Sequence, residues 1–381
     1  MKTAILTLTL HTNYGGILQC YALQTVLERM GHEVKVLDKK FDFKLPLYRY
    51  PLAYAKRIVF KYLLCKKGVD ILKEQKLKRE YAVVSQYTQP FIKRYIRAIY
   101  VPLTTEQMQK EGFQAFVVGS DQVWRPKYFS SRRSLIHQAY FSFTKGLSVK
   151  RLSYAASFGT DDWEYTPRQT RQCKALLQQF DGVSVRERGA VALCREHFGR
   201  EALHVLDPTM LLNAADYRQL IAQSPEPLQP IEGLMTYILD SDSEKEAVAQ
   251  RIAEHNGWSI FRGNSRCEDL TAPLTERIQP PVEQWLQGFA QARMILTDSF
   301  HACVFSILFH KPFVVIGNAA RGLSRFHSLL SLFGLESRLV TSAAEAERVA
   351  AQPICWETVD SRLEEERIKS MAFLKQHLGE V

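Results

Sequence analysis

The chain has 381 residues, which is too long for one ordinary domain and suits two domains of roughly 150–200 residues. Its 46% hydrophobic and 24% charged residues exclude a disordered chain, and seven scattered cysteines without a CxxC pair argue against a disulfide framework or a structural zinc site. Most of the net charge of +10 lies between Lys44 and Pro102, where fourteen Lys/Arg accompany three acids, so the overall charge is no argument for nucleic-acid binding.

The first forty residues predict the opening unit of a parallel α/β sheet. Residues 3–10 form a short apolar run that alternates with threonine and lacks a small-residue cleavage site, which favours a buried strand over a signal peptide. A turn at His11–Gly16 follows, then a helical pattern to about Met30 and a second strand at Glu33–Asp38. This β-turn-helix-β order is typical of doubly wound sheets.

Residues 45–110 interrupt this order with basic, aromatic-rich helical segments. The strand pattern resumes at residues 115–119, 151–155, 182–185 and 202–207, with helices at 168–180 and 188–198. A linker at 223–232 carries three prolines and marks a domain boundary. We therefore predict a first Rossmann-like domain over residues 1–222, with a basic helical insertion near 44–110.

A second series of strands and helices predicts another Rossmann-like domain over residues 233–358. Its strands are expected at 233–239, 258–262, 294–297 and 313–317, and its helices at 244–255, 284–292 and 302–309. No strand follows a final helix at about 360–378, so residues 359–381 are expected to pack back on the first domain. The predicted fold class is α/β, with two Rossmann-like domains facing each other across a cleft. Ligands of such sheets bind beyond the carboxyl ends of the strands.

The strongest candidate site is the turn that follows the predicted strand Met294–Thr297. Asp298, Ser299 and His301 occupy this turn, where free N–H groups and the positive end of a helix dipole suit a phosphate or a carboxylate. His301 could add a cationic group or donate a proton to a leaving phosphate. The alternative is that Asp298 or Ser299 only caps the helix and that His301 fills space.

The first strand-to-helix turn, Asn13-Tyr14-Gly15-Gly16, is the matching element of the first domain. Its glycines allow a ligand to approach the backbone closely, and His11 lies just before it at the strand end. The motif is not GxGxxG and no acidic residue is placed convincingly for a dinucleotide, so NAD is not expected. A tight turn with close helix packing is the alternative.

Further strand ends carry residues that could bind a sugar or an anion. Asp121 could hold sugar hydroxyls and Trp124 could stack on the sugar, although an Asx-turn and a core tryptophan are the alternative. Arg186 could clamp a carboxylate or phosphate, or pair with a surface acid. Arg321 and Arg325 follow the last predicted strand and are expected on the same cleft.

No metal site is expected. Asp240-Ser241-Asp242 has the DxD spacing of metal-dependent glycosyltransferases, but it directly precedes a helix whose cap we assign to Ser243 with Glu246. The histidines other than His11 and His301 show no ligand-type spacing.

The basic segment 44–102 alternates aromatic and cationic residues, which suits an interfacial helix on anionic lipid headgroups. A solvated helical insertion is the alternative, and RNA binding lacks a recognisable module. Because no run of about 18 apolar residues is present, no membrane span is expected. We expect a cytoplasmic protein, with this segment as a candidate contact to the inner face of the membrane.

Several motifs together resemble the polysaccharide pyruvyl transferase family, and they stand in the family's order along nearly the whole chain. They are Asn13–Gln19, Tyr21–Gln24, Val118–Trp124, Ser153–Gly159, Ser184–Glu187, Leu206–Thr209, Thr297–His301 and Lys311-Pro312. Each motif alone is weak, whereas the ordered set is specific.

The resemblance implies a glycosyltransferase-B-like fold and a role in bacterial capsule or exopolysaccharide synthesis. It implies transfer of a pyruvyl group from phosphoenolpyruvate, as co-substrate and without a cofactor, to two hydroxyls of a sugar, giving a cyclic ketal and phosphate. The family's strand-end histidine matches His301, and its arginine after the Ser-Val strand matches Arg186. Many members carry an arginine two residues before the histidine, where this chain has Ser299, so Arg321 or Arg325 could replace that contact.

The implied chemistry needs an acid, cations and a carboxylate. Protonation of the terminal methylene makes the central carbon of phosphoenolpyruvate electrophilic, and His301 is our candidate acid. Asp121 or Asp298 could orient or deprotonate the sugar hydroxyl. The candidate donor-binding residues are Arg186, Ser299, Arg321 and Arg325, with the second domain as the donor side. The candidate residues for a nucleotide- or lipid-linked sugar acceptor are His11, Asn13, Tyr14, Gly15, Gly16 and Trp124. A glycosyltransferase with a nucleotide-sugar donor and a non-catalytic sugar-binding module are the alternatives.

Overall fold

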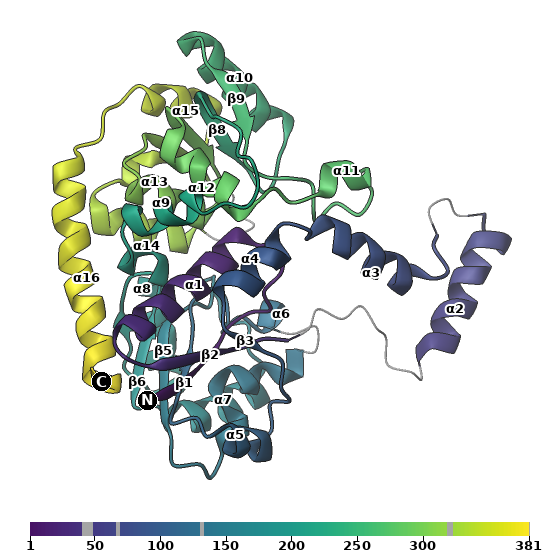
Figure 1. The fold of residues 1–381 in the computed structure, drawn as a ribbon, viewed down its shortest axis with the longest axis vertical. Helices are drawn as coiled ribbons and strands as arrows, with labels where there is room; N and C mark the ends of the chain where they lie inside the picture. Colours follow the sequence, from purple (N-terminus) through teal and green to yellow (C-terminus); the bar gives the residue numbers. More distant parts are fainter. Residues whose placement is uncertain (40–48, 66–68, 130–132, 318–322, 381) are drawn as a thin grey trace.

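The computed structural model describes residues 1–39, 49–65, 69–129, 133–317 and 323–380. Two α/β lobes lie one above the other, and α16 (Trp356–Leu378) runs along one side of both (Figure 1). We call the lobe built from residues 1–222 the N-lobe and the lobe built from residues 233–350 the C-lobe.

Seven parallel strands form the N-lobe sheet in the order β3-β2-β1-β4-β5-β6-β7. The strands are β1 (Lys2–Leu6), β2 (Glu33–Leu37), β3 (Ala98–Ile99), β4 (Ala115–Val118), β5 (Lys150–Ala156), β6 (Gly182–Val185) and β7 (Leu203–His204). β1 and β4 lie at the centre and are covered on both faces, which explains why their sequences are nearly continuous apolar runs.

Helices surround this sheet and extend from it. The N-lobe helices are α1 (Tyr14–Arg29), α2 (Tyr50–Ile58), η2 (Val59–Leu63), α3 (Lys73–Val84), α4 (Thr88–Tyr95), α5 (Thr105–Glu111), α6 (Pro126–Phe129), η3 (Arg133–Tyr140), η4 (Ser142–Thr144), α7 (Pro167–Leu177), α8 (Arg188–Leu193), η5 (Cys194–Phe198), η6 (Pro208–Leu211) and α9 (Ala214–Ala222).

Five parallel strands form the C-lobe sheet in the order β12-β11-β10-β8-β9. The strands are β8 (Gly233–Tyr237), β9 (Ser259–Arg262), β10 (Met294–Thr297), β11 (Phe313–Ile316) and β12 (Leu339–Val340). The C-lobe helices are α10 (Ser243–Asn256), α11 (Leu274–Arg277), α12 (Val282–Gln291), α13 (Phe300–Leu308), α14 (Ser324–Phe333), η8 (Glu336–Arg338) and α15 (Ala343–Ala350). The two parallel sheets confirm the predicted α/β fold of two Rossmann-like domains.

Several local features differ from the sequence prediction. The sequence pattern does not predict β3 or β12, because two residues are too few to show a strand period, and it does not predict α14 or α15. The predicted cap of α10 at Ser243 is wrong by one residue. The N-cap is Asp242, whose side chain accepts a hydrogen bond from the Lys245 amide at 2.9 Å.

α16 returns to the N-lobe and binds the segment that follows β7. The Ser370 hydroxyl accepts a hydrogen bond from the Leu206 amide at 3.0 Å. The Arg367 guanidinium donates to the carbonyl oxygens of Met210 and Leu212, at 2.6 and 2.8 Å. The helix therefore connects the far end of the C-lobe to the centre of the N-lobe.

The N-terminus of α1 lies at the contact between the lobes. Tyr14 is fully buried there, stacks on Trp285 of α12 at 5.2 Å between ring centroids, and donates a hydrogen bond to the Pro280 carbonyl at 2.7 Å. The first turn of α1 is thereby held against the C-lobe. Among the helices of the described ranges, none has the length and hydropathy that a membrane span needs.

A buried carboxylate at the end of β2 gives a prediction about stability. Burial raises the pKa of Asp38 to about 6 even though its Oδ1 accepts hydrogen bonds from the Leu10 and Lys39 amides. Because the folded pKa lies above the unfolded one, the native state loses stability as the pH rises from about 4 through 6. An asparagine oxygen can accept both bonds, so Asp38→Asn is expected to add about 2 kcal/mol at pH 8 and little at pH 4.

Urea unfolding of both proteins at the two pH values measures this difference. The matched control is Asp269→Asn, because hydrogen bonds from Thr271 and Arg266 lower the pKa of the exposed Asp269 to about 2. That substitution is expected to give no gain at pH 8. An equal gain of Asp38→Asn at both pH values would show that ionisation is not its cause.

Candidate active site

The carboxyl ends of strands from both sheets meet at a cleft of about 1190 Å³ between the lobes. From the N-lobe, the wall includes Thr12, Asn13, Gly15, Asp121 and Gln122. From the C-lobe, it includes Asp298, Ser299, Phe300 and His301 of the β10–α13 turn, together with Arg325 at the start of α14. The predicted cleft is therefore present, and α1 and α13 both begin at it.

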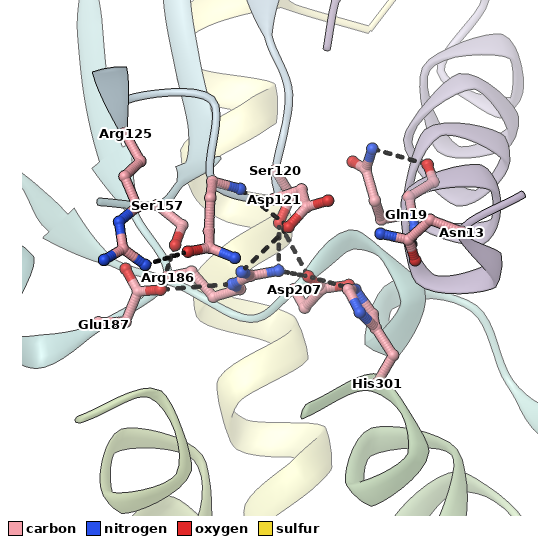
Figure 2. A network of polar contacts seen from close by, with 12 residues as sticks. Asn13, Gln19, Ser120, Asp121, Arg125, Ser157, Arg186, Glu187, Asp207 and His301 are labelled. Atoms are coloured by element: carbon pink, nitrogen blue, oxygen red, sulfur yellow. Dashed lines mark hydrogen bonds and ion pairs between the residues drawn. The ribbon is translucent and has the colours of Figure 1, made fainter. Parts of the chain in front are cut away.

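His301 reaches from the first turn of α13 to the N-lobe. Its imidazole packs so closely on Gly15 of α1 that a Cβ atom at this glycine would overlap the ring at Nδ1. On the other side of the ring, Nε2 lies 3.7 Å from Oδ2 of Asp207 (Figure 2). The histidine is thus held between a glycine and a carboxylate that both belong to the other lobe, while it still lines the cleft.

Asp207 is the centre of a buried polar network (Figure 2). Its Oδ2 accepts hydrogen bonds from Arg186 Nη1 and the Ser120 hydroxyl, both at 2.8 Å, and its Oδ1 accepts bonds from the amide and hydroxyl of Thr209. Burial acts to raise the pKa of Asp207, but the contact with His301 and the charge of Arg186 hold this pKa well below its usual range. The carboxylate is therefore charged and faces the imidazole.

Arg186 lies beneath the cleft and is not among the described residues that line it. Burial opposes its charge, but Asp207, Glu187 and Asp121 outweigh burial and raise its pKa. The Phe300 ring covers the guanidinium, with 4.4 Å between the ring centroid and Cζ of Arg186. Nη1 donates its hydrogen bond to Asp207, whereas the buried Nε and Nη2 have no hydrogen-bond partner among the described residues. The role of Arg186 as a clamp for the donor stays a prediction.

Asp121 is placed on the cleft wall by a tight turn. Its φ of +65° lies in the left-handed region, which aspartate adopts more readily than most residues other than glycine. Oδ1 accepts a hydrogen bond from the Gln122 amide at 2.9 Å and lies 3.8 Å from Arg186 Nη2. The carboxylate thus joins the buried network to the cleft.

Asp298 is buried, and its carboxylate is fully occupied by the β8–α10 loop. Oδ1 accepts a hydrogen bond from the Leu239 amide at 2.6 Å. Oδ2 accepts bonds from the Asp240 amide at 3.1 Å and from Lys245 Nζ at 2.9 Å. The geometry favours a role in positioning this loop over the predicted contact with a sugar hydroxyl.

Two aromatic residues predicted to bind the acceptor are part of the core. Trp124 is fully buried, stacks on Tyr140 at 5.0 Å, and donates its indole N–H to the Ala139 carbonyl. Tyr14 is buried between the lobes. Neither ring has a face open to a ligand, so their predicted role in acceptor binding is wrong.

The other predicted residues of the first turn lie at or near the cleft. Asn13 caps α1 by accepting a hydrogen bond from the Gly16 amide at 3.2 Å, and it lines the cleft. A Cβ atom on Gly16 would lie 3.6 Å from Asp121, so this glycine borders the carboxylate. His11 is half-buried and contacts the Thr12 hydroxyl at 2.9 Å, and Thr12 is the residue of this pair that lines the cleft.

Of the remaining predicted donor residues, Ser299 and Arg325 line the cleft, whereas Arg321 lies outside the described residues. Ser299 is the N-cap of α13, and its side chain makes no capping hydrogen bond. Burial and the charge of Arg186 lower the pKa of Arg325 to about 10, so this arginine stays charged at neutral pH. Within the described ranges no group of three His, Cys, Asp or Glu side chains is arranged to hold a metal ion.

The most important residue that the sequence reasoning missed is Asp207. Ser120, and Glu187 with its hydrogen-bond partner Ser157, belong to the same missed network. Asp207 follows β7 within the motif Leu206–Thr209, so its strand-end position was a usable signal. Its partner His301 comes from the other lobe, and no pattern in the sequence connects the two.

Solved structures with similar folds are distant in sequence. A structure from Listeria monocytogenes, assigned as a UDP-N-acetylglucosamine 2-epimerase, aligns over 100% of this chain and 98% of its own with a TM-score of 0.53 and 11% identity. UDP-GlcNAc 2-epimerase from Neisseria meningitidis aligns over 98% and 100% (TM-score 0.48, 8% identity), and MurG from Acinetobacter baumannii over 99% and 99% (TM-score 0.43, 9% identity). The structure from Listeria monocytogenes thus shares the fold of two α/β lobes with this chain.

The sequence comparisons identify the family directly. No curated protein sequence matches the chain. The family model for polysaccharide pyruvyl transferase matches residues 13–319, which include the first turn of α1, the Asp207 motif and the His301 turn. The chain belongs to the polysaccharide pyruvyl transferase family.

Proposed function

We propose that the protein transfers a pyruvyl group from phosphoenolpyruvate to two hydroxyls of a sugar, forming a cyclic ketal and releasing phosphate. The observation that carries this proposal is the placement of His301. Its ring lines the cleft, and the charged Asp207 carboxylate lies 3.7 Å from Nε2. A histidine that lines the cleft and is held in place by groups of both lobes is positioned to donate a proton to a bound substrate.

The donor anion would bind where α1 and α13 begin. The N-termini of both helices offer amide groups and positive dipole ends to the cleft, and the charged Arg325 lies beside them. Away from this point the C-lobe wall carries five carboxylates, of Asp242, Glu246, Glu268, Asp269 and Glu276, and the guanidinium groups of Arg262 and Arg266, which pair with three of them. A wall of mixed polar groups suits sugar hydroxyls, so we place the acceptor along it.

The reaction then proceeds in two additions. His301 donates a proton to the terminal methylene, and the first sugar hydroxyl attacks the central carbon as Asp121 accepts its proton. The C–O bond to phosphate then breaks and its electron pair leaves with the phosphate, which gives an oxocarbenium ion at the central carbon. The second hydroxyl adds to this carbon and gives its proton to the departing phosphate, and the proton on Asp121 returns to His301 through the solvent. The balance is two hydroxyls and phosphoenolpyruvate in, one ketal and one phosphate out, and it needs no redox step.

The proposed setting is bacterial capsule or exopolysaccharide synthesis in the cytoplasm, with the acceptor sugar linked to a nucleotide or to a lipid. The test is incubation with phosphoenolpyruvate and a panel of such sugars, with phosphate release and product mass as readouts. A product heavier by one pyruvic acid less one water supports the proposal. A product that gains a sugar from a nucleotide-sugar donor would show a glycosyltransferase instead, and sugar binding without any product would show a binding module.

Asp207 is a positioning residue in this proposal, and its removal gives a distinct prediction. Asp207→Asn is expected to lower kcat about 10- to 100-fold, because the imidazole loses the carboxylate that orients it. The pH profile of kcat/KM should also change, because a buried negative charge is removed beside the proposed proton donor. Breaking the buried pair with Arg186 should reduce the free energy of unfolding by on the order of 3 kcal/mol.

The control is Ser120→Ala, which removes one hydrogen bond to Asp207 and leaves the carboxylate charge in place. It is expected to leave the pH profile of kcat/KM unchanged. A profile that does not move in Asp207→Asn, with activity that follows stability alone, would reduce Asp207 to a structural role.

A further inference from the structure

An arm formed by α2 and η2 projects from the body of the protein. Figure 1 shows α2 far from both lobes, beyond the outer end of α3. None of the residues of α2 and η2 is buried. These fourteen residues therefore contribute nothing to the core of either lobe, and packing in the core does not explain why they form a helix.

The arm is nevertheless attached firmly to the wall of the cleft. Arg57 of α2 makes a double hydrogen bond to Glu74 of α3, at 2.6 and 2.7 Å. At the other end of α3, the Val84 carbonyl accepts a hydrogen bond from the amide of Gln279, which lines the cleft. Arg277 bridges the same region to Glu80 at 2.7 Å. The position of the arm is thus fixed relative to the opening of the cleft.

The surface of the arm carries many exposed apolar side chains. Six of the thirteen exposed large hydrophobic side chains in the described ranges lie on it or directly after it: Leu52, Ile58, Val59, Tyr62, Leu63 and Leu64. Leu52 and Leu63 are about three-quarters exposed, at 76% and 75%. Leu52, Val59 and Leu63 are spaced by seven and four residues, so they lie on one face of the helix.

The charge of the arm has one sign only. Between Tyr50 and Leu63 the sequence has three Lys/Arg (Lys56, Arg57 and Lys61) and no Asp or Glu. Lys56 and Lys61 lie over the rings of Phe60 and Tyr62, at 5.4 and 5.7 Å. Cations and aromatic rings beside an exposed apolar face are the composition of helices that lie in the headgroup region of an anionic bilayer.

We propose that the α2–η2 arm docks on an anionic membrane surface, with Leu52, Val59 and Leu63 inserted among the lipids and Lys56 and Lys61 at the headgroups. A second copy of the arm is a poorer occupant, because two surfaces without any acid would repel each other. Docking would hold the opening of the cleft at the membrane. The proposal is independent of the reaction, since it concerns only the arm and the lipid.

The test is co-sedimentation of the full chain with phosphatidylcholine vesicles, with and without phosphatidylglycerol. Binding is expected only with the anionic lipid and is expected to weaken with salt. Leu52→Ser with Leu63→Ser should weaken binding about tenfold through lost burial, and Lys56→Gln with Lys61→Gln should do the same through lost charge. The matched control is Ile368→Ser on α16, which removes a side chain that is 63% exposed and should leave binding unchanged.

Phosphate release with a water-soluble acceptor and circular dichroism show whether the arm variants stay folded. Equal binding of the native protein to neutral and anionic vesicles, or equal binding of the arm variants, would overturn the proposal. So would light scattering that shows a dimer of the native protein and a monomer of the Leu52→Ser, Leu63→Ser variant. Salt-sensitive binding to single-stranded RNA, lost in the lysine variant and without vesicle binding, would assign the arm to nucleic acid instead.

Discussion

Replacing His301 with alanine is expected to reduce phosphate release from phosphoenolpyruvate about 10³-fold, because the proposed reaction begins with a proton from this side chain. The ring is small and lies at the cleft, so the fold should survive its removal. Steady-state phosphate release in the presence of an active acceptor gives kcat and KM. We expect the loss in kcat, because the imidazole acts in the transition state.

His327→Ala is the matched control, because this exposed histidine lies on α14 and is not among the described residues that line the cleft. The His327→Ala variant is expected to have the same kcat as the native protein. Equal rates for His301→Ala and the native protein would remove His301 from the mechanism, and with it the assignment of the proton donor.

The second large effect is expected from a single methyl group. Gly15→Ala places a Cβ atom where the His301 ring now lies, so the imidazole must move out of its position between Gly15 and Asp207. Displacement of a catalytic group by about 1 Å can cost a factor of 10² in rate, and we expect a loss of kcat of that order. Helix stability works in the opposite direction, because alanine is a better helix former than glycine.

Gly16→Ala separates these two effects. A Cβ atom there would make only ordinary contacts, at 3.6 Å from Asn13 and Asp121. Both variants gain helix propensity, and only Gly15→Ala should lose most of its activity. Thermal unfolding together with kcat for the pair measures the difference. Similar activities in both variants would show that the contact between Gly15 and His301 does not set the position of the acid.

The sequence predicted the turns that form this site better than the contacts between those turns. The turn at Asp298–His301 was found because a buried strand, a polar turn and an apolar helix follow each other within one short segment. The glycine pair at residues 15 and 16 was found for the same reason. The contact between Gly15 and His301 spans 286 positions and two lobes, and no local pattern encodes it.

The wrong assignments share a physical cause. Trp124 and Tyr14 lie near strand ends, where an aromatic ring can either contact a ligand or pack in the core. Because the same residue types occur in both roles, the sequence does not distinguish between them. For Arg186, whose role as a clamp stays a prediction, the sequence did not show which acid binds one side of the guanidinium. For Asp298, the amides of residues 239 and 240 donate hydrogen bonds to the carboxylate. These amides reach Asp298 only in the folded loop, so the sequence does not reveal them.

α16 has a consequence for the order in which the protein becomes active during synthesis. Its residues Arg367 and Ser370 hold Leu206 and Met210, which flank Asp207 on both sides. The ribosome makes this helix after the strands that the structure describes, so the segment around Asp207 lacks these hydrogen bonds until the end of synthesis. We expect the site to assemble late and in one step, with no active intermediate on the ribosome.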